Sequence, residues 1–139
     1  MNKSEIDLSI LKKALASFQE VILEYKKDQN NSFVRDSYIQ RFEYCYDLSV
    51  KFIRRFLKNE ADYQENINQM SFQEIIREGY NKGILKNSWD KWWQYRDARN
   101  ATSHSYNEKK ALEIIPNLEP FYQEVKFLLE KLVQNETKI

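Results

Sequence analysis

The scarcity of glycine and proline places the strongest constraint on the fold of this chain. Only two residues of each type occur among 139. All-β folds need frequent turns, which these residues favour, whereas Leu, Ile, Lys, Glu and Gln, abundant here, favour helices. A hydrophobic content of 42% and an aromatic content of 14% are enough for one domain with a real core. We therefore expect residues 1–139 to form a single all-α domain.

Two long amphipathic segments occupy the first half of the chain. Apolar residues recur at three- and four-residue steps before a polar break at 27–32, which predicts a helix of about six turns with Ser4 as its N-cap. A second helix is expected over 33–59. The two apolar stripes are Leu8, Leu11, Leu15, Phe18, Ile22 and Tyr25, then Tyr38, Phe42, Cys45, Ser49, Phe52 and Phe56.

Local signals place a short helix after a polar loop at 60–70. Ser71 and Glu74 form a capping-box pattern, in which each side chain bonds the backbone N–H of the other residue. Gly83 can adopt the left-handed conformation that ends a helix, with Ile84 as its apolar partner. These signals predict a helix that begins at Ser71 and ends at Gly83.

The next helix is rich in tryptophan. Asn87 or Ser88 can cap it, and it contains Trp89, Trp92, Trp93 and Tyr95. Three tryptophans so close together suit a helix that buries one face in the domain and offers another to a partner.

Two prolines limit the helices near the end of the chain. Residues 108–115 can form about two turns before Pro116, and Pro120 can lie in the first turn of the last helix. That helix has an apolar stripe of Phe121, Val125, Leu128 and Leu132. The expected architecture is an up-and-down bundle of four main helices plus a short extra helix.

Composition limits the compartment and the partners. No apolar run approaches the length of a membrane span, and the N-terminus lacks a signal-peptide core, so we expect a cytoplasmic protein that does not enter a membrane. Cys45 is the only cysteine, which excludes an intrachain disulfide, and we place it in the core. The net charge of +1 does not by itself indicate a nucleic-acid binder. However, the segment from Lys82 to Lys110 contains seven basic residues and three acidic ones, a local excess of positive charge.

The only histidine, His104, limits what chemistry the chain can perform near neutral pH. Arg99 and Asn100 lie within one and a half helical turns of it, which supplies a phosphate-binding group, an amide and a general acid or base. In a straight helix Asn100 and His104 share a face, whereas Arg99 and His104 diverge by roughly 140°. Either the arginine reaches round, or the helix ends near Ser103 and turns the imidazole back. An ordinary surface histidine is the alternative, because this short pattern also arises by chance.

Three segments in order resemble the HEPN superfamily, in particular its nucleotidyltransferase-associated branch of HepT-like toxins and nucleotidyltransferase substrate-binding proteins. Residues 40–48 resemble the second-helix signature of that family. Residues 71–80 followed by 83–85 resemble its third helix, and residues 95–106 match its Arg-x4-His-x-Tyr motif without a gap.

The resemblance implies a helical homodimer that acts with a minimal nucleotidyltransferase as a toxin–antitoxin pair. This chain would be the ribonuclease toxin, and the antitoxin would transfer AMP from ATP and Mg²⁺ onto Tyr106. The older family name implies a milder role, in which this chain binds substrate for the nucleotidyltransferase. No cofactor or metal of its own is expected.

For a ribonuclease we assign proton transfer to His104, stabilisation of phosphorane charge to Arg99, and orientation of the phosphate or imidazole to Asn100. The residues assigned to RNA or nucleotide binding are Arg96, Lys109 and Lys110. Separate acid and base groups favour two histidines, so a two-fold dimer should place both motifs in one cleft. Two alternatives remain: a non-catalytic substrate-binding or nucleotide-binding subunit, and a structural helical dimer in which the motif is incidental.

Overall fold

The computed structural model describes residues 7–60, 63 and 65–137. This part of the chain contains six α-helices and three short 3₁₀ helices. The α-helices are α1 (Ser9–Lys27), α2 (Ser32–Asn59), α3 (Phe72–Asn81), α4 (Trp89–Ala101), α5 (Glu108–Ile114) and α6 (Leu118–Thr137). The prediction of four main helices is confirmed, but two short helices, α3 and α5, accompany them where the expected architecture had one.

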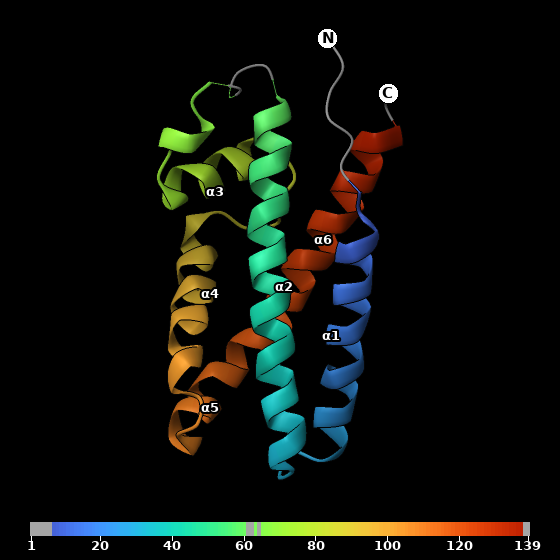
Figure 1. Cartoon of the computed structure of the whole chain (residues 1–139), viewed down its shortest axis with the longest axis vertical. Coiled ribbons are helices and arrows are strands. Elements are labelled where there is room, and N and C mark those ends of the chain that lie inside the picture. Colours follow the sequence, from blue (N-terminus) through green and yellow to red (C-terminus); the bar gives the residue numbers. More distant parts are fainter. Residues whose placement is uncertain (1–6, 61–62, 64, 138–139) are drawn as a thin grey trace.

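The helices form an up-and-down bundle (Figure 1). α1 and α2 run antiparallel side by side, and α6 crosses them diagonally. α4 lies along the other side of α2. α3 closes one end of the bundle and α5 lies at the opposite end.

α2 begins within one residue of the predicted position, whereas α1 begins at Ser9, later than a helix capped by Ser4 would. α1 starts at Ser9, whose N–H donates to the Asp7 carboxylate at 2.9 Å. The predicted cap Ser4 lies outside the described residues. α2 starts after Asn31, whose Oδ1 accepts the N–H groups of Phe33 and Val34 at 2.9 and 3.2 Å. This amide satisfies N–H groups that lack a partner within the helix.

Both predicted ends of α3 are confirmed. The capping box of Ser71 and Glu74 is present. At the other end Gly83 has a φ of +82°, and its N–H donates to the carbonyl of Tyr80 at 3.0 Å. The N–H of Ile84 donates to the carbonyl of Gly79 at 3.1 Å, which completes a Schellman motif.

The start of α4 differs from the prediction. Ser88 occupies the N-cap position, but its side chain makes no capping hydrogen bond. The amide of Asn87 instead donates to the Glu124 carboxylate at 3.0 Å. Glu124 also accepts the N–H of Asn87 at 3.2 Å and that of Lys86 at 2.7 Å. A buried carboxylate on α6 therefore holds the connection before α4, an interaction that no local pattern signals.

Two boundaries contain 3₁₀ turns that the sequence did not predict. The polar stretch at 60–70 includes a turn at Ile67–Gln69, where Ile67 is buried in the core. α5 ends at Ile114, and a turn at Ile115–Asn117 contains Pro116 before α6 begins. Pro120 lies in the first turn of α6, as predicted.

The core is rich in aromatic side chains. Phe121 of α6 has ring-centroid distances of 5.2 Å to Phe42 and 5.7 Å to Tyr46, both on α2. It lies 5.7 Å from Trp92 and 5.1 Å from Tyr95, both on α4. One phenylalanine therefore joins three helices.

Cys45 lies in this core, as predicted, and burial raises the pKa of its thiol to about 12. The thiolate form is therefore scarce at neutral pH. No helix in the described part of the chain is long and apolar enough to cross a membrane.

Replacing Gly83 with alanine should destabilise the protein by about 1–2 kcal/mol, the cost of a left-handed conformation for a residue with a Cβ. A Cβ here would meet no atom within 4 Å, so steric collision contributes nothing. Urea unfolding of Gly83→Ala measures the effect. Asn81→Ala, at an exposed position two residues earlier, is the control and should stay within about 0.5 kcal/mol of the wild type. Equal stability of Gly83→Ala and wild type would contradict the argument.

Glu124 should make stability depend on pH. Burial raises its pKa above 4.5, although hydrogen bonds from Asn87 and Lys86 oppose the shift. The folded protein then holds the proton more tightly than the unfolded chain, so this contribution to stability is lost as pH rises from below 4.5 through the raised pKa. We expect the difference in unfolding free energy between wild type and Glu124→Gln to fall over that window.

Urea titrations at a series of pH values measure this difference, with Glu130→Gln, an exposed position on the same helix, as the control. A difference that grows as pH rises would mean that the hydrogen bonds outweigh burial and that the pKa is lowered.

Candidate functional site

The Arg-x4-His segment lies where α4 ends, at the α5 end of the bundle (Figure 1). α4 stops at Ala101, and residues Thr102–His104 form a 3₁₀ turn. α5 then begins after Asn107, whose side chain accepts the N–H groups of Lys109 and Lys110 at 2.9 and 3.4 Å. The motif therefore spans the last turn of α4, which holds Arg99, and the 3₁₀ turn that holds His104, and does not lie along one straight helix.

Arg99 is held by carboxylates from α2. Its Nε and Nη2 donate to the two oxygens of Asp47, each at 3.0 Å, which forms a bidentate pair. Its Nη1 donates to Thr102 Oγ1 at 2.9 Å and lies 3.3 Å from Glu43 Oε2. The hydrogen bond with Asp47 raises the pKa of Arg99 and thus preserves its charge. Two carboxylates face this one guanidinium.

His104 and Tyr106 lie near each other on the solvent side of the turn. Their ring centroids are 6.4 Å apart, and the ring planes are inclined at 63° to each other. His104 is exposed, and Tyr106 is 87% exposed. Among the described residues no hydrogen bond joins the imidazole to Arg99. α4 ends at Ala101, two residues before Ser103, and the side chain of Arg99 extends to Asp47 on α2 rather than to His104.

The remaining predicted residues lie around this turn. Asn100 is exposed, and its backbone carbonyl accepts a hydrogen bond from the Ser103 hydroxyl at 3.2 Å. Arg96 packs its guanidinium over the Phe72 ring at 5.4 Å, which is a cation–π contact. Lys109 and Lys110 are exposed in the first turn of α5, and Lys110 lies 3.5 Å from Glu113. The fold brings His104, Tyr106 and the two lysines to one end but directs Arg99 and Arg96 toward other partners.

The sequence and the fold together identify the family. A family model described as "nucleotidyltransferase substrate binding protein like" matches residues 6–134. The chain belongs to this family. As a member of it, the chain is also similar to a Haemophilus influenzae protein named "probable ribonuclease HepT", with 33% identity over 142 residues that cover 96% of this chain and 97% of the relative.

A solved structure from Haemophilus influenzae is similar to this family member as well. It is described as the substrate-binding domain of a nucleotidyltransferase, and it superposes with a TM-score of 0.83 at 32% identity. The match covers 91% of this chain and 98% of the other. The predicted resemblance to HepT-like and nucleotidyltransferase substrate-binding proteins is confirmed.

Glu43 and Asp47 are residues of the candidate site that the sequence analysis did not identify. They are four residues apart on α2, so they lie on one face of the helix, and both belong to the segment 40–48 that carries the family resemblance. An acidic pair beside a buried aromatic stripe is the signal that could have identified them. Their partner Arg99 is 52 residues away from Asp47 in sequence, so only the packing of α2 against α4 reveals the contact.

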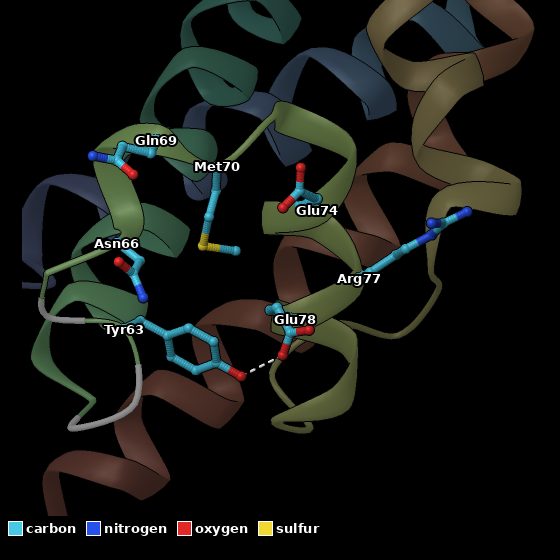
Figure 2. A pocket seen from close by; sticks show the side chains of 7 residues that line it. All are labelled: Tyr63, Asn66, Gln69, Met70, Glu74, Arg77 and Glu78. Carbon is cyan, nitrogen blue, oxygen red and sulfur yellow. Dashed lines mark hydrogen bonds between the residues drawn. The ribbon is translucent and has the colours of Figure 1, made fainter.

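A cavity of about 590 Å³ lies at the opposite end of this family member, against α3. Figure 2 shows the side chains of Tyr63 and Met70 in the space between their own backbone and α3, whereas Arg77 on α3 points away from them. The two carboxylates that line the cavity already have partners, because Glu78 accepts a hydrogen bond from the Tyr63 hydroxyl and Glu74 forms the capping box with Ser71. Among the described residues no group of three or more His, Cys, Asp or Glu side chains is placed to hold a metal ion.

Proposed function

We propose that this protein is a HEPN-type toxin of a toxin–antitoxin pair, which cleaves RNA without a metal ion and is neutralised by AMP transfer from a nucleotidyltransferase partner. His104 carries the proposal. It is the only histidine of the chain, and it is exposed beside Tyr106 on the turn between α4 and α5. The name of the Haemophilus influenzae relative supports a ribonuclease activity, and the family description supports the nucleotidyltransferase partner.

In the proposed reaction the RNA 2′-hydroxyl attacks the adjacent phosphorus and gives its proton to a base. The 5′-oxygen leaves with a proton from an acid, and the products carry a 2′,3′-cyclic phosphate and a 5′-hydroxyl. His104 performs one of these transfers. Because each chain has one histidine, a two-fold dimer supplies the second.

The other groups position the RNA. Asn100 orients the phosphate, while Arg96, Lys109 and Lys110 attract the strand through charge. Arg99 can contact the developing phosphorane charge only if the phosphate displaces a carboxylate, because Asp47 already occupies two of its nitrogens.

AMP on Tyr106 would block this site. The phenol oxygen attacks the α-phosphorus of ATP, pyrophosphate leaves, and the phenol proton is released. The product adds a negative charge two residues from His104, where it competes with the RNA phosphate. Since Tyr106 is 87% exposed, the partner can reach it without unfolding the bundle.

A second candidate is a non-catalytic subunit that binds substrate or nucleotide for the nucleotidyltransferase. Two observations favour it. Arg99 is paired with carboxylates, and the solved relative is described as a substrate-binding domain.

We predict that the purified protein cleaves labelled RNA in EDTA and that His104→Ala lowers the rate by about 100-fold or more, the usual contribution of a general acid or base. Gel analysis of end-labelled RNA measures cleavage, and intact mass must first show that Tyr106 is unmodified. Tyr44→Phe, at a half-exposed position on α2, controls for the effect of a surface substitution.

Full cleavage by His104→Ala would contradict the assignment of His104. No cleavage by either protein, together with measurable nucleotide binding, would favour the non-catalytic subunit.

Incubation with the nucleotidyltransferase, ATP and Mg²⁺ should add AMP to the wild type but not to Tyr106→Phe, because the substitution removes the phenol oxygen that is the proposed acceptor. Peptide mass spectrometry locates the adduct, and Tyr44→Phe should be modified as the wild type is. An adduct on another residue would contradict the assignment of Tyr106.

A further inference from the structure

We propose that Asp47 is a positioning residue for His104, and that it acts through Arg99 and Thr102. Asp47 and Glu43 hold the Arg99 guanidinium, and Arg99 in turn fixes the turn that carries the imidazole. Arg99 then connects α4 to α2 and does not bind the RNA phosphate. The activity test of this inference rests on the proposed ribonuclease function, whereas its structural test does not.

A continuous set of hydrogen bonds connects α2 to the turn. Asp47 accepts two bonds from Arg99, each at 3.0 Å. Arg99 Nη1 donates to Thr102 Oγ1 at 2.9 Å, and that hydroxyl donates to the Arg99 carbonyl at 2.7 Å. The Thr102 carbonyl accepts the N–H of Ser105 at 3.1 Å, which closes the 3₁₀ turn around His104.

Of the three residues in this turn, Thr102 is the buried one. Thr102 is 5% exposed, whereas Ser103 and His104 on the same turn are exposed. A 3₁₀ turn also has poorer hydrogen-bond geometry than an α-helix. The position of the imidazole therefore depends on how firmly Thr102 is held, and Arg99 provides that support from α2.

The charge at Arg99 opposes phosphate binding. Nε, Nη1 and Nη2 all contact oxygens of Asp47, Thr102 or Glu43. Because two carboxylates face one guanidinium, the cluster has a net negative charge, and a phosphate approaching it would be repelled. A group that binds the transition state should offer unoccupied donors, and this guanidinium offers few.

Four variants test whether Asp47 and Thr102 hold the imidazole in place, and Arg99→Lys is added for the kinetic measurement. Asp47→Asn removes one of the two acceptors, and Thr102→Val removes the hydroxyl while keeping the shape. Thr102→Ser keeps the hydroxyl, and Asp36→Asn changes an exposed carboxylate near the start of α2 as a control. Thermal unfolding identifies any variant that fails to fold, and the Thr102 pair replaces Asp47→Asn if that variant does.

The structural readout is the NMR signal of the His104 ring, which is unambiguous because the chain has one histidine. We expect this signal to move in Asp47→Asn and Thr102→Val and to stay in place in Thr102→Ser and Asp36→Asn. An unchanged signal in both Asp47→Asn and Thr102→Val would overturn the proposal, whether or not the protein cleaves RNA.

The kinetic readout separates positioning from phosphate binding. We expect Asp47→Asn and Arg99→Lys each to lower kcat about 10- to 100-fold, the effect of a displaced catalytic group, with KM for RNA changed by less than about 2-fold and the double variant no worse than either single one. A raised KM with normal kcat in Arg99→Lys would show that Arg99 binds the phosphate and would overturn the proposal. Absence of cleavage in the wild type would contradict the proposed function alone and leave the NMR result to decide this inference.

Discussion

The packing around Phe121 sets the relation between the helices. Its ring contacts the rings of Phe42 and Tyr46 on α2 and of Trp92 and Tyr95 on α4. Interiors packed this closely permit little sliding of one helix past another. Asp47 follows Tyr46 directly, and Arg99 lies one turn beyond Tyr95, so the aromatic contacts fix the distance between the carboxylate and the guanidinium. The geometry of the exposed motif is therefore decided in the core.

Interactions between near neighbours could be predicted from sequence. The capping box at Ser71 and the left-handed Gly83 each depend on residues within one turn, and both occur as predicted. The apolar stripes of α1, α2 and α6 also lie in the core, because helical periodicity determines which face is buried.

Interactions between residues far apart in the sequence could not be predicted from the sequence. Glu124 contacts residues 37 and 38 positions away, and Asp47 contacts one 52 positions away, so neither contact has a local signature. The sequence identified Arg99 and His104 as a pair, but it could not show that the arginine turns toward α2. Helical geometry indicated that the two side chains diverge. The missing information was the presence of an acidic partner on the neighbouring helix.

Trp92 and Trp93 are adjacent in sequence but lie in opposite environments. Trp92 is completely buried, whereas Trp93 is 50% exposed. The ring centroid of Trp92 lies within 6.3 Å of those of Tyr46, Phe72, Tyr95 and Phe121. A collisional quencher in solution will reach the second indole and not the first. Fluorescence of single-tryptophan variants would thus report separately on the integrity of the bundle interior and on contacts made at the outer face of α4.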